Sequence, residues 1–309
     1  MSKGIALIFH KEEDGNLFEQ ILLVLKAGYS LVTATELEQL LLQKKSTANT
    51  CHITFDDGLL SFYTVVFPLL KKHKVPASLF VSPEVISSRK NFWFQETEGY
   101  DETILKSIVS SELGLPVTKL GGFSSQQVLK CLPLKRINNI IASYRQQTGS
   151  EEKSPLNMNT DQLRELDASG LVTIGAHTIN HPVLKNENDQ DCFDEIDRSV
   201  KGLAEMLHHP VRYFAYPNGR PVLDFGERET NYLHKAGISM AFSTELDNLA
   251  GTKNILSVPR MGFPRMGLSV TNPLIKFRIG LGKKWIDIRS IGKPTEKEIR
   301  ENLKKIISI

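Results

Sequence analysis

The sequence predicts an α/β fold, a distorted (β/α) barrel of seven or eight strands that carries a helical insertion. The first observation is an alternation of short β-rich runs with helical patterns, which is typical of parallel strands joined by helices. The second is the length of 309 residues, since a single α/β barrel often reaches about 250 residues. The third is the composition, with 40% apolar and 24% charged residues, which supplies a core and excludes a disordered chain.

Eight runs of apolar and β-branched residues are the expected strands, and eight suit a barrel. They are Ile5–His10, Ser30–Thr33, His52–Phe55, Ala77–Ser82, Val172–Ala176, Tyr213–Tyr216, Met240–Ser243 and Ile255–Pro259. Six segments between them have apolar residues at three- and four-residue spacing, which predicts amphipathic helices. These are Leu17–Ala27, Thr35–Gln43, Ser61–His73, Asp161–Ala168, Asp191–Leu207 and Glu229–Ala236.

The segment from about 87 to 155 interrupts this alternation, because a connection of that length is far longer than a usual βα loop. We expect an inserted helical region there, within a barrel domain that spans residues 1–272. The insertion begins with the aromatic run Asn91–Phe94, directly after an expected strand. This run has two interpretations, a wall of a substrate cleft or a hydrophobic anchor that holds the insertion to the barrel.

Residues 273–309 form a basic C-terminal extension, with ten Lys and Arg against four Asp and Glu. Its last part begins with a capping-box pattern at Thr295–Glu298 and predicts an amphipathic helix. The apolar face of that helix consists of Ile299, Leu303, Ile306 and Ile307. One hypothesis is peripheral contact with an anionic membrane. The alternative, which we favour, is a terminal helix docked on the barrel with its lysines in solvent.

Charge, cysteine content and hydropathy exclude several classes of protein. A net charge of +3 does not indicate a nucleic-acid partner. The three cysteines are far apart and suggest reduced thiols rather than disulfides or a thiolate zinc site. The apolar run Ile5–Phe9 is too short for a cleaved export signal, and no stretch is long enough to span a membrane. We therefore expect a cytoplasmic protein.

Two adjacent carboxylates, Asp56 and Asp57, follow the expected strand His52–Phe55. Like charges side by side repel each other, which is unfavourable without a partner. However, Gly58 comes next, and an Asp-Gly pair is also an ordinary turn signal. This segment alone therefore fits a structural turn as well as a functional site.

Two histidines, His177 and His181, lie four residues apart at the end of another expected strand. A solvated turn would explain a lone histidine pair. Strand ends of a barrel meet on one face, however, so the Asp pair and the His pair are expected together. One Asp and two His leave an open position for water, as in catalytic zinc sites. The remaining Asp could take a proton from that water, which is the chemistry of a hydrolase.

Three motifs at strand ends resemble those of a known family: TFDDG at 54–58, HTINH at 177–181 and RYFAYPNG at 212–219. They are similar to the motifs TFDDG, H-[ST]-x-x-H and R-x-F-R-x-P-Y-G of the polysaccharide deacetylases of the NodB-homology type, also called carbohydrate esterase family 4. The resemblance covers roughly residues 4–86 and 156–265. It implies a distorted (β/α) barrel of seven or eight strands, in agreement with the strand count.

The resemblance also implies a role for each site residue. Asp56 is the expected general base, and the backbone N–H of Asn218 the expected oxyanion donor. The expected metal ligands are Asp57, His177 and His181. Tyr216 and Pro217 of the third motif are expected substrate contacts, and Trp93 of the aromatic run in the insertion, which lies outside the resemblance, is a third. We expect Zn²⁺ first, with Co²⁺, Ni²⁺ or Fe²⁺ as alternatives for such a ligand set.

Two departures from the family pattern affect these roles. Ala215 stands where many members have an arginine that pairs with the base, and Arg212, Arg220 and Arg260 are three possible replacements among which the sequence does not choose. The family's late Leu-x-His, which supplies the general acid, is also missing, because His234 is the last histidine.

A branch of the family that includes the deacetylases of poly-N-acetylglucosamine export has circularly permuted motifs, with the acid at the end of the first strand. His10 fits that pattern, although a histidine held by loop contacts would look the same. The other histidines considered, which are His52, His73, His208 and His209, are expected in surface or capping roles.

The predicted function is that of a metal-dependent hydrolase that removes N-acetyl groups from an amino-sugar-containing glycan or glycan precursor. One alternative is a deformylase or other small-amide hydrolase with the same site, and another is a non-catalytic sugar-binding relative. The expected partner is an N-acetylated carbohydrate, with no nucleic acid. A setting at the inner membrane face, in cell-surface glycan synthesis, is a further hypothesis.

Overall fold

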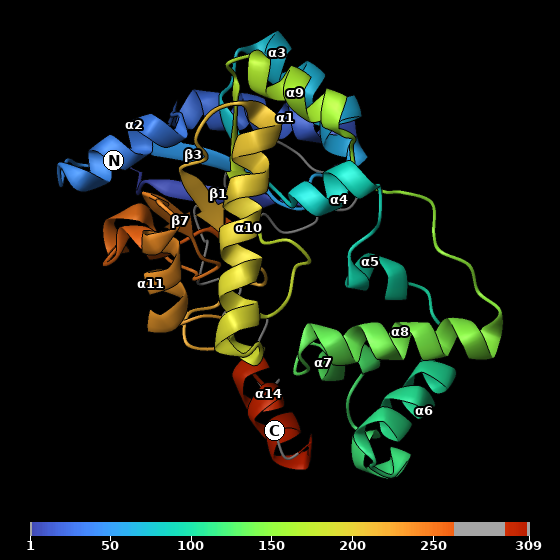
Figure 1. The fold of residues 1–309 in the computed structure, drawn as a ribbon. Helices are drawn as coiled ribbons and strands as arrows, with labels where there is room; N and C mark the ends of the chain where they lie inside the picture. Colours follow the sequence, from blue (N-terminus) through green and yellow to red (C-terminus); the bar gives the residue numbers. More distant parts are fainter. Residues whose placement is uncertain (1, 263–293, 308–309) are drawn as a thin grey trace.

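The computed structural model describes residues 2–262 and 294–307, and in this part of the chain a curled parallel sheet is surrounded by helices (Figure 1). The strands are β1 (Ile5–Phe9), β2 (Ser30–Leu31), β3 (Thr50–Phe55), β4 (Ala77–Val81), β5 (Val172–Ala176), β6 (Tyr213–Ala215), β7 (Met240–Phe242) and β8 (Met261–Gly262). Their order is β7-β6-β5-β4-β3-β1-β8, and β2 pairs with β3. The predicted α/β distorted barrel is thus confirmed.

The segment 258–262 joins the two edges of the sheet. At its start, the Val258 N–H donates to the Ala241 carbonyl and the Val258 carbonyl accepts from the Ser243 N–H, both at 2.8 Å. At its end, β8 pairs in parallel with β1. A short segment therefore contacts β7 at one end and β1 at the other, which brings the two sides of the barrel together.

The eighth predicted strand, Ile255–Pro259, was placed wrongly. Ile255–Ser257 is a 3₁₀ turn, and the strand lies further along at β8. The turn forms because the Asn254 side chain accepts the Leu256 N–H at 2.9 Å, which caps a helical turn instead of an extended one. The other seven predicted strands agree with the structure to within two residues.

The six predicted helices are present, each to within two residues. They are α1 (Gly15–Gly28), α2 (Ala34–Leu42), the π-helical turn η1 (Phe62–Val66) continuing into α3 (Phe67–His73), α9 (Thr160–Ala168), α10 (Asp189–Leu207) and α11 (Glu227–Lys235). The π-helical turn precedes Pro68, which lacks an N–H for the usual i→i−4 hydrogen bond. A further short helix, α4 (Pro83–Ser88), follows β4.

The main hydrophobic core lies between the sheet and the outer helices, and a second cluster fills the inside of the barrel with residues such as Phe80, Tyr213 and Phe242. Gly175 is required there, because a Cβ at this position would lie 2.5 Å from the Phe80 ring. His52 is also inside, with Nδ1 2.8 Å from the Val32 carbonyl. Our expectation of a surface or capping role for His52 was therefore wrong.

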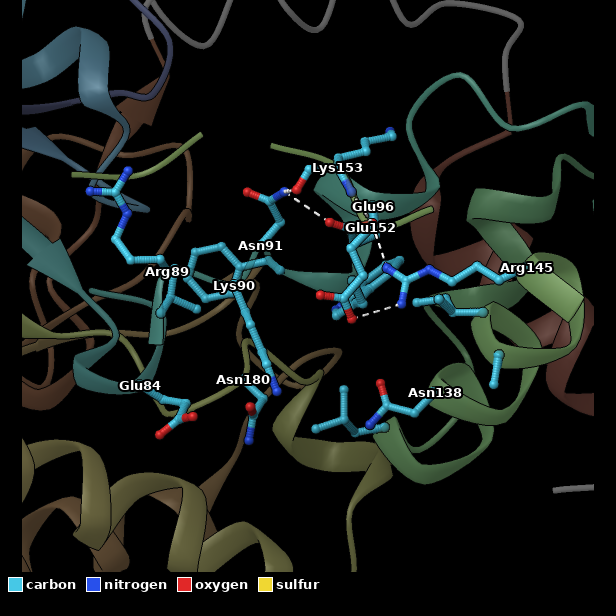
Figure 2. Close-up of a pocket in the computed structure, with 16 residues that line it drawn as sticks. Glu84, Arg89, Lys90, Asn91, Glu96, Asn138, Arg145, Glu152, Lys153 and Asn180 are labelled. Atoms are coloured by element: carbon cyan, nitrogen blue, oxygen red, sulfur yellow. Dashed lines mark hydrogen bonds and ion pairs between the residues drawn. The ribbon is translucent and has the colours of Figure 1, made fainter. Parts of the chain in front are cut away.

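The segment from about 87 to 155 contains helices that pack around a second hydrophobic cluster, called the insertion's core below. It contains α5 (Trp93–Thr97), α6 (Glu102–Leu113), the 3₁₀ turn Val117–Leu120, α7 (Ser125–Leu129) and α8 (Leu134–Thr148). In Figure 1, α6, α7 and α8 form a group beside the barrel, and α5 lies between that group and α4. A cavity of about 380 Å³ is lined by residues of α4, α5 and α8 (Figure 2).

The C-terminal helix α14 (Glu296–Ile307) packs on the insertion. Leu303 and Ile307 belong to the insertion's core, and Ile299 and Ile306 pack against it. The buried Arg300 forms an ion pair with Asp224 of the barrel. We expected this helix to dock on the barrel, but the insertion covers its apolar face. Membrane contact through 273–309 stays a prediction, and residues 273–293 lie outside the described residues.

Across residues 2–262 and 294–307, no helix combines the length and the apolar character needed to cross a bilayer.

Candidate metal centre

The Asp pair and the His pair meet at one edge of the sheet. β3 ends at Phe55 and leads into Asp56 and Asp57, and β5 ends at Ala176 and leads into His177. Both strands pair in parallel with β4, which lies between them. Carboxyl ends of neighbouring parallel strands lie at the same edge, so these side chains converge.

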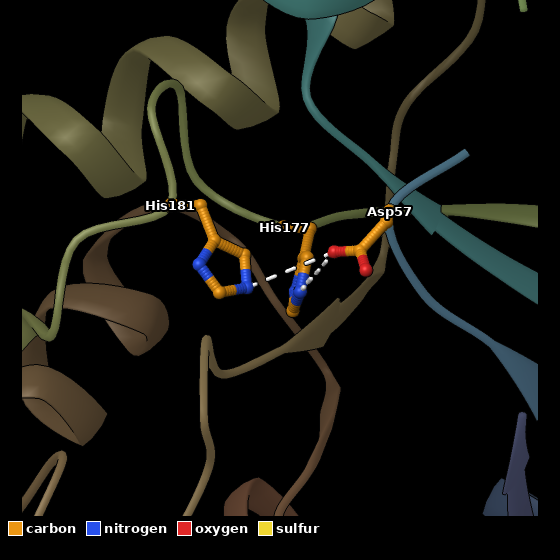
Figure 3. Close-up of side chains that lie close together, drawn as sticks. All are labelled: Asp57, His177 and His181. Carbon is orange, nitrogen blue, oxygen red and sulfur yellow. Dashed lines mark ion pairs between the residues drawn. The ribbon is translucent and has the colours of Figure 1, made fainter. Parts of the chain in front are cut away.

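Asp57, His177 and His181 form a buried cluster that could hold a metal ion (Figure 3). The Asp57 Oδ1 atom is 3.7 Å from Nε2 of His177 and 3.7 Å from Nε2 of His181. Tetrahedral ligands about 2.1 Å from one ion are about 3.4 Å apart, so these separations suit a shared cation. Asp57 Oδ1 is buried without a hydrogen-bond partner in the described part of the chain, which also fits a missing positive charge.

The histidines present the correct ring nitrogen to this centre. Nδ1 of His177 is 2.7 Å from the Ala215 carbonyl, so it donates there and leaves Nε2 as the acceptor. The pKa of His181 is lowered well below its usual value, first by burial and then by the neighbouring His177. Its imidazole is therefore neutral near pH 7, which is the form that binds a metal.

The loop between the two histidines is a tight turn rather than a helical one. Thr178 and His181 have φ angles of 62° and 57°, which are left-handed. The Glu195 carboxylate of α10 holds the loop, because it accepts the N–H groups of Ile179 and Asn180 at 3.0 and 2.9 Å. The His181 N–H donates to Thr178 Oγ1 at 3.0 Å. The strained backbone is thus fixed by buried and partly buried hydrogen bonds around the cluster.

Asp57 is held in a left-handed conformation too, with φ of 72°, and Gly58 follows with φ of 68°. A side chain at 58 would be strained at this φ, and its Cβ would lie 2.8 Å from Cγ1 of Val81. Glycine is therefore needed where the chain turns away from the strand. Burial raises the pKa of Asp57, while nearby imidazoles act in the opposite direction.

Asp56 has a separate partner, Arg260. Both guanidinium NH₂ groups donate to its carboxylate, at 2.7 and 2.8 Å, and Arg260 is fully buried. Burial alone would raise the pKa of Asp56, but Arg260 and His177 outweigh it and lower the pKa to about 2. The carboxylate is therefore ionised and oriented. Of the three arginines considered, Arg260 is the one that is hydrogen-bonded to Asp56.

The other two arginines lie elsewhere. Arg212 pairs with Glu38 of α2 at 2.9 Å, and Arg220 is exposed.

A cavity of about 1000 Å³ opens between the strand ends and the insertion. Its lining includes Asp57 and His10 together with Leu60, Phe94 and Tyr100. His10 is exposed at the end of β1 and lines this cavity together with Asp57. The structure therefore brings the predicted acid to the same cavity as the cluster.

Asn218 follows β6 in a left-handed conformation, with φ of 58°. Its carbonyl accepts from Thr244 Oγ1 at 2.6 Å, which fixes the orientation of this turn. Its side-chain Nδ2 is buried without a hydrogen-bond partner among the described residues. Its assignment as the oxyanion donor stays a prediction.

The three expected substrate contacts face elsewhere in this structure. Tyr216 is 1% exposed, stacks on Phe225 and donates to the Leu256 carbonyl at 2.9 Å. Pro217 is buried and does not line the cavity. Trp93 is buried in the insertion's core, and its Nε1–H donates to the His181 carbonyl at 2.9 Å. The anchor interpretation of Asn91–Phe94 thus holds for Trp93.

Phe94 is the aromatic residue of that run that reaches the cavity, and its ring centroid is 4.7 Å from that of His181. Sequence reasoning also missed Glu195 and Asn157, which hold the two ligand loops. No local motif marks these residues, because each contact joins segments that are separate in the chain.

Fold and site together define an α/β barrel with a candidate metal centre and a hydrogen-bonded carboxylate at the carboxyl ends of its strands. The chain belongs to the polysaccharide deacetylase family, whose model matches residues 43–114 and 124–241. This match extends into the insertion, which we had expected to lie outside the family resemblance. It includes both the Asp pair and the His pair.

One curated relative and two solved structures of similar fold illustrate the similarity. The curated "Putative polysaccharide deacetylase YxkH" of Bacillus subtilis (strain 168) is 22% identical over 219 residues, which are 71% of this chain and 53% of that protein. This chain thus matches about half the length of that relative. The Streptococcus pyogenes deacetylase PplD in complex with acetate has a TM-score of 0.59 at 17% identity, covering 90% of this chain and 98% of its own. IcaB from Ammonifex degensii has a TM-score of 0.56 at 20% identity, and the match covers 91% of this chain and 98% of IcaB.

Proposed function

We propose that the protein is a metal-dependent hydrolase that removes N-acetyl groups from an amino-sugar-containing glycan or glycan precursor. The observation that carries this proposal is the buried Asp57, His177 and His181 cluster directly beside the Asp56 carboxylate. Membership of the polysaccharide deacetylase family supports the substrate class. Zn²⁺ is the first candidate for the ion, and Co²⁺, Ni²⁺ and Fe²⁺ are alternatives with the same ligand types.

In this proposal, a named residue of the chain carries out each proton transfer and stabilises the oxyanion of amide hydrolysis. A bound divalent cation would polarise the amide carbonyl and make a water molecule easier to deprotonate. Asp56 takes the proton from water, and Arg260 keeps this carboxylate oriented. The Asn218 backbone N–H donates to the oxyanion that develops on the carbonyl oxygen. His10 as an imidazolium gives a proton to the departing amine.

The cavity supports a sugar substrate in size and in chemistry. Its volume of about 1000 Å³ exceeds that of a lone acetyl group and leaves room for neighbouring units of a glycan. Phe94 and Tyr100 offer aromatic surface to sugar faces, and Gln126 offers an amide for hydroxyl groups. The Asp56–Arg260 pair removes one of the two reasons for a non-catalytic relative, the missing arginine at Ala215, and the other reason is the absent late histidine.

Acetate release from N-acetylhexosamine monomers and oligomers tests the proposal. Metal-loaded wild type is expected to release acetate, and Asp56→Asn is expected to bind metal but lose turnover by about 10²-fold or more. His10→Ala is expected to slow release as well. Equal activity in Asp56→Asn would remove the assigned base. Formate release from N-formyl sugars, with no acetate from the panel, would instead favour the deformylase alternative.

A further inference from the structure

The first helix of the insertion, α5, is hydrogen-bonded to both loops that carry the candidate metal ligands. The Trp93 Nε1–H donates to the His181 carbonyl at 2.9 Å. On the other side, Gln95 Nε2 donates to Asn157 Oδ1, and Asn157 Nδ2 donates to the Asp57 carbonyl, each at 2.7 Å. One short helix therefore contacts the His181 loop directly and the Asp57 loop through a single side chain.

These hydrogen bonds are buried, so water does not replace them easily. Trp93, Gln95 and Asn157 are 5%, 4% and 2% exposed. The two carbonyls that they hold belong to the left-handed residues His181 and Asp57. A left-handed conformation at a non-glycine residue persists only when its surroundings fix it. Loss of either hydrogen bond would therefore leave a strained ligand residue with an unsatisfied carbonyl.

A charged network fixes α5 to the rest of the insertion. Glu96, the residue after Gln95, accepts from Arg145 of α8 at 2.7 Å and from Asn91 at 2.8 Å. Arg145 also bonds Glu152 at 3.1 Å (Figure 2). Gln95 Oε1 accepts the Phe92 N–H at 2.7 Å, which closes the first turn of the helix. The helix is thus held on the side away from the ligand loops as well.

We propose that Trp93 and Gln95 are positioning residues that set the geometry of the metal ligands, so that the insertion is a working part of the metal centre. Trp93 orients the loop that carries His181, and Gln95 acts through Asn157 on the loop that carries Asp57. This inference rests on the proposed metal-dependent function.

The test uses full-length Trp93→Phe and Gln95→Met, with Ile140→Val as a matched control. Phe keeps an aromatic ring but lacks the N–H, and Met keeps length but lacks the amide. Ile140 is buried in the insertion's core and is not part of either hydrogen-bonded path. Co²⁺ affinity is measured by competition with a chelator, and the visible absorption of the Co²⁺ protein reports ligand geometry. Thermal unfolding of the metal-free proteins measures general destabilisation.

We expect Co²⁺ affinity to fall about 10- to 100-fold in Trp93→Phe and Gln95→Met, with altered Co²⁺ spectra and little change in Ile140→Val. Wild-type affinity and spectra in both variants would overturn the inference while leaving the proposed function intact. If wild type itself bound no Co²⁺, both this inference and the proposed metal dependence would be wrong. If Trp93→Phe does not fold, the Co²⁺ affinity and spectrum of Gln95→Met decide the question. This variant removes only the Gln95 amide and keeps the packed indole of Trp93.

Discussion

Asp56 and Asp57 are neighbours in the chain but have opposite electrostatic surroundings. Arg260 donates two hydrogen bonds to Asp56 and contributes to a pKa of about 2. Among the described residues no arginine pairs with Asp57, and burial raises its pKa. Environments that push two carboxylates apart assign them different tasks. Here Arg260 satisfies the Asp56 carboxylate, and the Asp57 carboxylate is the one that belongs to the cluster that could hold a cation.

Arg260→Gln is expected to reduce both stability and activity. The substitution leaves the buried Asp56 charge without its cation, and such a loss typically costs about 3–5 kcal/mol in the free energy of unfolding. Turnover should fall by about 10²-fold because the carboxylate loses its orientation. Urea unfolding and acetate release measure the two effects. Arg220→Gln is the control, since Arg220 is exposed, and an equal loss in that variant would contradict the role of the Arg260 pair.

His52 makes folding stability depend on pH. Burial lowers the pKa of His52 from 6.5 to about 4. The hydrogen bond to the Val32 carbonyl acts in the opposite direction but is the smaller effect. The unfolded chain therefore binds a proton below pH 6.5 that the folded protein takes up only near pH 4, so stability falls as the pH falls through this range. From pH 7.5 to 5 the loss from this residue is about 2 kcal/mol.

Urea unfolding of wild type and His52→Asn at both pH values isolates that contribution from those of other titrating groups. The variant should be less stable at pH 7.5 but should lose about 2 kcal/mol less on acidification. Equal pH dependence in the two proteins would show that the buried imidazole does not titrate as described.

The site residues that could be predicted from the sequence are those whose place in the fold follows from their position just after a strand. Asp56, Asp57, His177 and His181 each lie within five residues after a strand, and a parallel barrel collects its strand ends on one face. Arg260 could be named only as one of three candidates, because its contact with Asp56 spans 204 residues of sequence. Asn157 could not be predicted at all, since no periodicity relates it to Asp57.

At the scale of elements, the sequence-based boundaries fail where side chains decide between two local structures. The Ile255–Pro259 run has strand composition, but the Asn254 cap converts its first residues into a 3₁₀ turn. The C-terminal amphipathic helix was predicted from its own pattern, whereas its docking surface was not. The apolar face of a helix predicts that another part of the protein covers it. Which part does so is visible only in the folded chain.

Leu303→Ala should loosen the contact between α14 and the insertion. Leu303 is fully buried in the insertion's core, and a buried Leu→Ala exchange typically costs about 2–5 kcal/mol. Hydrogen exchange should show faster amide exchange in α7, which contacts α14, with little change in the barrel strands. Lys305→Ala on the exposed face of the same helix is the control. Unchanged protection of α7 would argue that the insertion is stable without this helix.

At the scale of the whole molecule, three separate parts of the chain meet at the candidate metal centre. The barrel supplies the ligands, the insertion covers them through α5, and the segment 258–262 both joins the sheet edges and carries Arg260. The contact between the sheet edges and the hydrogen bonds to the Asp56 carboxylate thus come from the same five residues. A cation bound to this cluster would stabilise the folded chain, because the unfolded chain does not hold the three side chains together.

Metal removal should accordingly lower the stability of the folded protein. A cation present at 100 times its dissociation constant stabilises the state that binds it by about 2.7 kcal/mol, which for a chain of this size raises the Tm by about 4 °C. Scanning calorimetry with Zn²⁺ and with chelator measures the difference.

Two isosteric variants of adjacent residues test whether the Zn²⁺-dependent shift comes from this cluster. Asp57→Asn should abolish the Zn²⁺-dependent shift because it removes a ligand charge, whereas Asp56→Asn should retain it because Asp56 is occupied by Arg260. A shift of wild-type size in Asp57→Asn would place the bound cation outside this cluster.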